Sequence, residues 1–155
     1  MRKSVMRAAS AVNTWVYRLS GGRLMGRMFG APVGLLTTTG RMSGRARTVP
    51  LLYLADGGDF VVVASQGGAP RHPGWFLNLE AHPQAGLQIG ARRMAVTARR
   101  LDPGERDRLW PAVVALYRPY EDYQRRTTRL IPLVRLTPAD RSLPGRGPRA
   151  HAARQ

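Results

Sequence analysis

The residues best suited to binding a charged ligand lie in one turn, residues 40–47, which reads Gly-Arg-Met-Ser-Gly-Arg-Ala-Arg. Three guanidinium groups and a hydroxyl share this segment, and its two glycines allow backbone amides to face a ligand. Arginine forms paired charge-assisted hydrogen bonds with phosphate and carboxylate groups, and turn amides add further donors. The turn therefore indicates an anion site, although a solvated basic hairpin would have the same composition.

A second glycine-bearing loop, Ser65-Gln66-Gly67-Gly68, follows an apolar run and could offer amides to the same anion. It lacks the Gly-Lys-Ser/Thr ending of a Walker loop and does not match the Gly-x-Gly-x-x-Gly dinucleotide pattern. On its own this loop is a weak signal.

Three tyrosines, Tyr117, Tyr120 and Tyr123, are spaced by three residues, with Pro119 between the first two. Each offers an aromatic wall and a hydroxyl that can donate a hydrogen bond, which suits a flat ring that carries carbonyl or nitro groups. The same spacing also fits the edge of an amphipathic core, and in isolation that interpretation is favoured.

Composition excludes several other kinds of site. The 155 residues contain no cysteine, so disulfides, thiolate metal sites and cysteine nucleophiles are absent. The three histidines, His72, His82 and His151, are too scattered to suggest a metal site, and we predict none. No Ser-His-Asp constellation or pair of buried carboxylates suggests hydrolysis.

Positive charge dominates the chain, with a formal net charge of +16 and no acidic residue among the first 50. Such a field attracts anions, but no nucleic-acid-binding module is recognisable, so we expect no nucleic-acid partner.

Apolar residues recur at helical spacing over residues 5–19 and predict an amphipathic helix. This helix could pack on the protein's own core or lie on an anionic membrane surface.

Apolar and β-branched runs between glycine-rich turns predict the remaining elements. We expect strands over residues 33–39, 47–55, 60–65, 86–89, 94–101 and 131–136. Short helices are expected over 74–81, after Pro73, and over 102–117, where Asp102, Pro103 and Glu105 form a capping-box pattern. Pro111 is expected to kink the second helix.

Six strands with few helices predict a mainly β protein with accessory helices (α+β), built as a small six-stranded antiparallel barrel. A doubly wound fold would require a regular strand-helix alternation that this sequence lacks. We divide the chain into an N-terminal amphipathic helix and connector (1–30), the barrel domain (31–138) and a disordered basic tail (139–155).

In their order along the chain, these motifs resemble the deazaflavin-dependent nitroreductase and quinone reductase family, whose members are split β-barrel oxidoreductases that use reduced coenzyme F420. The resemblance runs from about residue 13 to Pro138. It rests on five blocks: LLTTTGRMSG (35–44), RTVPL (47–51), VASQGG (63–68), HPGWFLNL (72–79) and YRPYEDYQ (117–124).

This resemblance implies an FMN-binding-protein-like split barrel in which the basic hairpin holds the phosphate and acidic tail of the cofactor. The implied cofactor-binding residues are Arg41, Met42, Ser43, Arg47, Thr48, Val49, Pro50, Leu51, Leu52, Val63, Ala64, Ser65, Gln66, Gly74, Trp75, Phe76, Leu77, Asn78 and Tyr120. Residues matching the substrate pocket, and hence the catalytic candidates, are Ser65, Tyr117, Tyr120 and Tyr123.

The sequence departs from the family pattern at several of these positions. Met42 and Gln66 stand where a lysine is common, which removes two positive charges near the anionic tail, and Arg45 could replace one of them. His72 and Gly74 replace a more usual Asn and Met, so the rim of the pocket can differ.

The resemblance implies hydride transfer from reduced F420 to a quinone, nitroaromatic or activated-alkene acceptor. One alternative is a split-barrel reductase that binds FMN, because the phosphate-site chemistry is shared. Another is a non-catalytic, basic, membrane-associated cofactor-binding module. We expect a cytoplasmic protein, with peripheral contact to an anionic membrane through the N-terminal helix as an open possibility.

Overall fold

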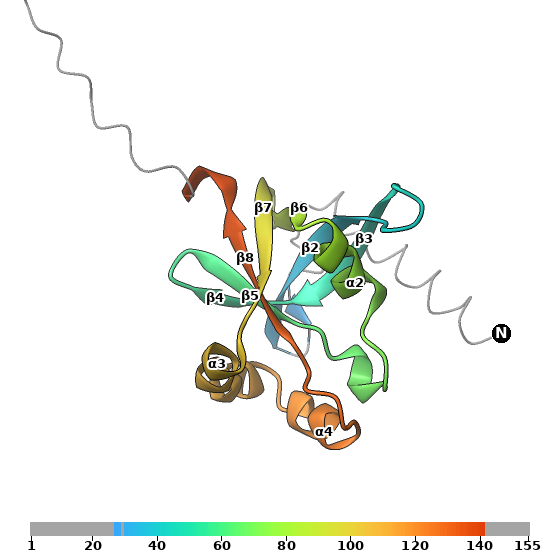
Figure 1. Cartoon of the computed structure of the whole chain (residues 1–155). Helices are drawn as coiled ribbons and strands as arrows, with labels where there is room; N and C mark the ends of the chain where they lie inside the picture. Colours follow the sequence, from blue (N-terminus) through green and yellow to red (C-terminus); the bar gives the residue numbers. More distant parts are fainter. Residues whose placement is uncertain (1–26, 29, 142–155) are drawn as a thin grey trace, which may run out of the picture.

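The computed structural model describes residues 27–28 and 30–141. The predicted N-terminal helix lies outside these residues, as does nearly all of the predicted basic tail. Within them, a curled antiparallel sheet forms the body of the protein, and the helices α3 (Pro103–Leu116) and α4 (Pro119–Arg125) cover one end of it (Figure 1). The strands are β1 (Arg27–Met28), β2 (Ala31–Thr39), β3 (Ala46–Leu52), β4 (Leu54–Asp56), β5 (Asp59–Val63), β6 (Gln84–Ile89), β7 (Arg92–Arg100) and β8 (Leu133–Pro138). The helices are α2 (Gly74–Ala81), α3 (Pro103–Leu116) and α4 (Pro119–Arg125), with 3-10 turns at Gln66–Gly68 and Ala139–Arg141.

Strand pairing runs in the order β1-β2-β6-β7-β8-β5-β4, and β3 pairs with β2. All of these pairs are antiparallel, so side chains on alternate residues line the inside of the curl. The six predicted strands are all present, but the predicted strand 47–55 is two strands. Tyr53 separates β3, which pairs with β2, from β4, which pairs with β5. The chain therefore leaves its pairing with β2 and begins to pair with β5 at Tyr53.

Two hydrophobic clusters support the candidate site. One lies inside the curl, where Leu36, Val62, Ala64, Trp75 and Phe76 are buried together. The other lies beneath α3 and α4 and includes Val61, Val63, Val113, Tyr120 and Ile131. Because alternate residues of β5 face opposite sides, this one strand contributes to both clusters.

Helix α3 begins as its sequence predicts. The carboxylate of Asp102 accepts a hydrogen bond of 2.8 Å from the backbone N–H of Glu105, and Pro103 occupies the first helical position. Arg99 donates two hydrogen bonds to the Glu105 carboxylate, at 2.7 and 2.9 Å. The helix continues through Pro111 to Leu116.

Helix α4, which carries Tyr120 and Tyr123, is an element that the sequence analysis did not predict.

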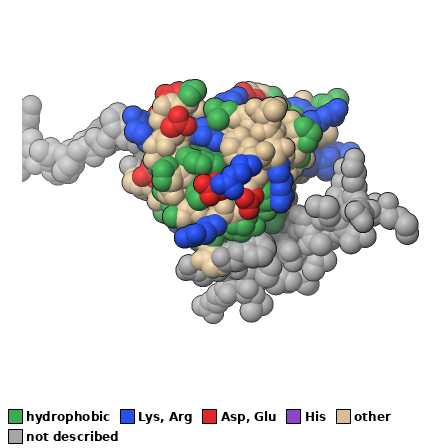
Figure 2. Space-filling model, turned by 90° about the horizontal axis from the view of Figure 1, so that it is seen from below, with side chains coloured by type: hydrophobic (Ala, Val, Ile, Leu, Met, Phe, Trp, Pro, Cys, Tyr) green, Lys and Arg blue, Asp and Glu red, His purple; other side chains and the backbone are tan. Residues whose placement is uncertain are grey.

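Acidic and basic side chains are intermixed at this end of the molecule, as Figure 2 shows. Arg125, for example, pairs with both Glu121 and Asp122. The surface at this end of the molecule therefore carries both positive and negative charges.

Candidate active site

The basic turn between β2 and β3 is a closed hairpin loop. The N–H of Gly40 donates to the carbonyl of Arg45, and the N–H of Gly44 donates to the carbonyl of Gly40, both at 2.8 Å. The Ser43 hydroxyl accepts from the N–H of Arg45 at 3.2 Å. A Cβ on Gly40 would lie 2.6 Å from the Ser43 hydroxyl, and Gly44 has a φ of 68°. Both glycines are therefore required by the shape of this turn.

Asn78 on α2 ties this hairpin to the body of the protein. Its side-chain oxygen accepts hydrogen bonds from the backbone N–H of Arg41 at 3.1 Å and from the Arg41 guanidinium at 3.3 Å. Its amide nitrogen donates to the hydroxyl of Thr38 at 3.1 Å. Asn78 and Thr38 are both buried, so this arrangement sets the position of the loop from within the core.

A cleft of about 830 Å³ opens between the hairpin and α2. Nine of the predicted cofactor-binding residues line it, together with Gly40 and Ala46, which belong to the predicted anion-binding turn but not to the predicted cofactor-binding set. The nine are Arg41, Met42, Ser43, Arg47, Thr48, Val49, Gly74, Trp75 and Asn78. No Asp or Glu of the described chain lines the cleft, and Arg41 and Arg47 are exposed there. The lining therefore suits an anion.

Other predicted cofactor-binding residues do not line this cleft. Pro50, Leu51 and Leu52 continue along β3 and are half-buried. Phe76 is 2% exposed and packs edge-on against Trp75 in the core, whereas Leu77 is half-buried on the same helix. Phe76 thus supports the wall of the cleft from behind.

The predicted second loop forms the 3-10 turn Gln66–Gly68 and packs against α4. Gln66 has a φ of 44°, in the left-handed region that a non-glycine residue rarely adopts. A Cβ on Gly68 would lie 2.6 Å from the backbone oxygen of Tyr123, so only glycine allows this close approach. Ser65, just before the turn, is 8% exposed.

The three predicted tyrosines do form one cluster. The ring centroids of Tyr117 and Tyr120 are 4.9 Å apart, and those of Tyr120 and Tyr123 are 6.2 Å apart. The hydroxyls of Tyr117 and Tyr123 are hydrogen-bonded at 3.2 Å. That hydrogen bond, aided by burial, raises the pKa of Tyr117 to about 12, and burial is the main cause that raises the pKa of Tyr120. Both hydroxyls are thus protonated at neutral pH and can act as donors.

The segment 63–66 connects the cleft with the tyrosine cluster. Ala64 packs in the same hydrophobic cluster as Trp75 and Val49 of the cleft. Its neighbour Val63 packs in the cluster that contains Tyr120. Ser65 and Gln66 follow directly in the chain and lead into the 3-10 turn that packs against α4.

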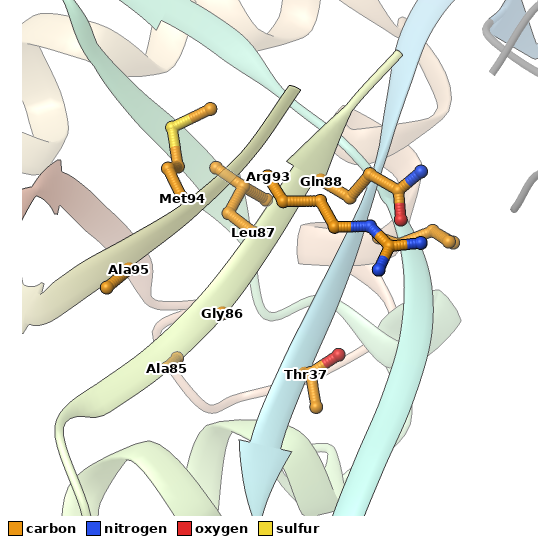
Figure 3. Close-up of a pocket in the computed structure, with 9 residues that line it drawn as sticks. Thr37, Ala85, Gly86, Leu87, Gln88, Arg93, Met94 and Ala95 are labelled. Atoms are coloured by element: carbon orange, nitrogen blue, oxygen red, sulfur yellow. The ribbon is translucent and has the colours of Figure 1, made fainter. Parts of the chain in front are cut away.

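A second cavity, of about 510 Å³, contains none of the predicted site residues. It lies on β2, β6 and β7, where Thr37, Leu87, Gln88, Arg93 and Met94 contribute to its lining (Figure 3). Gln88 and Arg93 are cross-strand partners, and their side chains extend alongside each other. Nothing in the sequence had indicated this cavity.

Neither a metal-binding cluster nor a membrane-spanning helix is present among the described residues. They contain no group of three or more His, Asp or Glu side chains that could hold a metal ion. No helix among them has the length and apolar character needed to cross a bilayer.

Comparison with known proteins gives a consistent result. Residues 9–138 match the family described as F420H(2)-dependent quinone reductase. The F420H(2)-dependent quinone reductase of Mycobacterium tuberculosis (strain H37Rv) is 44% identical over 126 residues, which cover 79% of this chain and 85% of that protein.

Two solved structures are also similar. One is described as an F420-H2 dependent reductase (FDR-A). It is 42% identical with a TM-score of 0.63, over 68% of this chain and 93% of that chain. The other, described as a domain-swapped dimer, is 38% identical with a TM-score of 0.64, over 79% of this chain and 97% of that chain.

These findings confirm the split β-barrel fold, the oxidoreductase class and the coenzyme that the resemblance implied. The chain belongs to the F420H(2)-dependent quinone reductase family.

Proposed function

We propose that this chain transfers a hydride from reduced coenzyme F420 to a quinone, with the anionic part of the coenzyme in the hairpin cleft and the quinone beside Ser65 and the tyrosine cluster. The observation that carries the proposal is the continuity of these two parts. A cleft that contains Arg41 and Arg47, with no carboxylate of the described chain in its lining, is joined to the tyrosine cluster by the single segment 63–66.

The residues of the cleft fit the coenzyme that the family uses. Its phosphate and acidic tail require cationic and N–H donors, and the cleft offers the guanidinium groups of Arg41 and Arg47 and the hydroxyl of Ser43. No ion pair with a carboxylate of the described chain occupies either guanidinium. Thr48, Val49 and Trp75 provide a half-buried to buried wall for the remainder of the molecule. When bound, a reduced deazaflavin supplies a hydride and disfavours radical chemistry with oxygen.

The chain's own residues would stabilise the acceptor. A quinone that gains a hydride develops negative charge on its oxygen, and a fixed hydrogen-bond donor lowers the energy of that state. Tyr120 meets this requirement because burial keeps its hydroxyl protonated, and its hydroxyl makes no hydrogen bond to another described residue. We propose that Ser65, which is buried just before the 3-10 turn, contributes a second donor. The proton that completes the hydroquinone comes from a tyrosine or from solvent.

Both positions at which this chain lacks a common lysine are exposed in the structure. Met42, where lysine is common, is 91% exposed at the tip of the hairpin, and Gln66 is exposed in the 3-10 turn. Arg45 is exposed in the same hairpin as Met42. We propose that Arg41 and Arg47 carry most of the attraction for the anionic tail, with Arg45 as a partial replacement for the missing lysine.

A reaction in the absence of oxygen tests this function. Reduced F420 is mixed with the protein, menadione is added, and the return of oxidised deazaflavin absorbance is followed. Protein-dependent oxidation that requires the quinone supports the proposal, and its absence would refute it. Parallel reactions with reduced FMN, a nitroimidazole and an enone separate the flavin alternative and the other acceptors.

The N-terminal segment remains a separate proposal. Its predicted amphipathic helix lies outside the described residues, as do residues 142–155 of the predicted basic tail. Sedimentation with anionic vesicles, comparing the full chain with a chain that starts at Gly30, tests whether a cytoplasmic protein contacts the membrane through this segment. Equal sedimentation of the two would refute that contact.

A further inference from the structure

Arg129 makes an unusual set of hydrogen bonds with a loop that lies far away in the sequence. Its Nε donates to the carbonyl of Ala69 at 2.8 Å, and its two terminal nitrogens donate to the carbonyls of Ala64 at 3.1 Å and Ser65 at 2.7 Å. The nitrogen that reaches Ala64 also lies 3.0 Å from Nδ1 of His72. One planar guanidinium thus spans the whole loop that contains Ser65.

This loop needs such support because its backbone is strained. Gln66 holds a left-handed conformation that costs free energy for a side chain with a Cβ. The loop's own hydrogen bonds are few: Gly68 donates to the Ser65 carbonyl and Ala69 donates to the Gln66 carbonyl. Arg129 binds carbonyls on both sides of the strained residue, so it fixes the backbone that carries the Ser65 hydroxyl.

Arg129 is itself fixed to the helix that carries the tyrosines. Its backbone carbonyl accepts a hydrogen bond of 2.8 Å from the side chain of Gln124 on α4. The Gln124 side-chain oxygen accepts from buried Arg106 at 2.8 Å and from the N–H of Ile131 at 2.9 Å. Arg129 therefore links the Ser65 loop on one side to the tyrosine helix on the other.

His72 takes part in this arrangement only in its neutral form. A guanidinium offers donors alone, so Nδ1 of His72 must be the acceptor and the ring proton must be on Nε2. The ring also packs against Phe76 of α2, with centroids 4.8 Å apart. The charged groups that act on it are Arg129, Arg100 and Glu80, and burial together with the two arginines lowers its pKa. A proton on Nδ1 would face the Arg129 N–H groups.

We propose that Arg129 is a positioning residue for hydride transfer, which holds the Ser65 loop against the tyrosine helix with neutral His72 as its partner. Protonation of His72 removes one acceptor and repels the guanidinium, which loosens the loop. This inference rests on the proposed function, because that function gives Ser65 its role at the acceptor.

The first test compares Arg129→Lys with Arg108→Lys, a matched control at an exposed arginine of α3. Lysine keeps the charge but cannot reach three carbonyls in one plane. We expect Arg129→Lys to lower kcat with menadione about tenfold or more, because small misplacement of a reacting group is costly, while KM for reduced F420 changes little. A variant that melts at a lower temperature but keeps its kcat would show that Arg129 is a loop anchor only.

The second test uses the pH profile of kcat. The wild-type protein should lose turnover as pH falls through a His72 pKa below 6.5, and His72→Asn should lack this loss because asparagine keeps an acceptor but does not titrate. An identical acid limb in both proteins would remove His72 from the proposal.

A third measurement is independent of coenzyme and activity. Amide hydrogen exchange on the protein without ligand should be faster at Gly68 and Ala69 in Arg129→Lys than in the wild type, but unchanged in Arg108→Lys. If the wild-type protein fails to oxidise reduced F420, the proposed function falls. Hydrogen exchange still decides whether Arg129 holds the loop, and equal exchange rates would overturn that part.

Discussion

Asn78 offers the sharpest test of how the cofactor cleft is built. Asn78→Ala removes the hydrogen bonds to the Arg41 backbone, the Arg41 guanidinium and the Thr38 hydroxyl. Each bond contributes about 1 kcal/mol, and the buried Thr38 hydroxyl loses a partner, so we expect the free energy of unfolding to fall by about 2–4 kcal/mol. For a folded part of this size that corresponds to a melting temperature lower by roughly 10 °C.

Asn78→Asp separates stability from binding. The carboxylate keeps the shape of the amide and can still accept hydrogen bonds from Arg41, while the Thr38 hydroxyl, which accepts from the Asn78 amide, can turn and donate to the carboxylate instead. Melting should therefore change much less than in Asn78→Ala. Its negative charge lies against Arg41, one of the cations of the cleft, and should raise the Kd for F420 by about tenfold. Thermal unfolding followed by circular dichroism and F420 titration by calorimetry measure the two effects. If Asn78→Ala melts like the wild type, or if Asn78→Asp binds F420 as tightly, the geometry deduced for the hairpin is wrong.

Three further variants test separate parts of the account. Arg47→Ala should raise the Kd for F420 roughly 10- to 100-fold, since it removes a charge-assisted hydrogen bond of about 1.5–3 kcal/mol, and calorimetry that shows unchanged affinity would exclude Arg47 from the site. Tyr120→Phe should lower kcat with menadione without altering the circular dichroism spectrum, and undiminished turnover would leave that hydroxyl without a chemical role. The hydrogen bond from Arg99 lowers the pKa of Glu105 from 4.5 to about 2, so ionised Glu105 stabilises the fold above pH 4.5 and this contribution is lost as pH falls towards 2. Glu105→Gln should lack that loss in acid unfolding curves, and curves that fall in parallel with the wild type would contradict the assignment.

Much of the site could be predicted because its signals are local. Glycines at positions 40 and 44 bound a turn whose shape requires them, and Asp102 with Pro103 begins α3 as helix-capping chemistry dictates. The arginines and Ser43 lie in that same turn, so their shared location follows from the sequence alone.

The features that were missed depend on contacts distant in the sequence. The one break signal in the run 47–55 is Pro50, which lies within β3, and the run divides instead at Tyr53 because β3 and β4 pair with different strands. Helix α4 spans Pro119–Arg125, too short for a hydrophobic period to be recognisable. Arg129 resembles any other arginine in this basic chain, since its partners lie about 60 residues away.

The central claim is that guanidinium groups of the β2–β3 hairpin hold coenzyme F420 in the cleft beside α2. Titration calorimetry with F420, comparing the wild-type protein with an Arg41→Ala/Arg47→Ala double variant, tests it most directly. The account predicts saturable one-site binding by the wild type that weakens with added salt and is lost in the double variant. Equal binding by the two proteins, or no heat from the wild type, would contradict it.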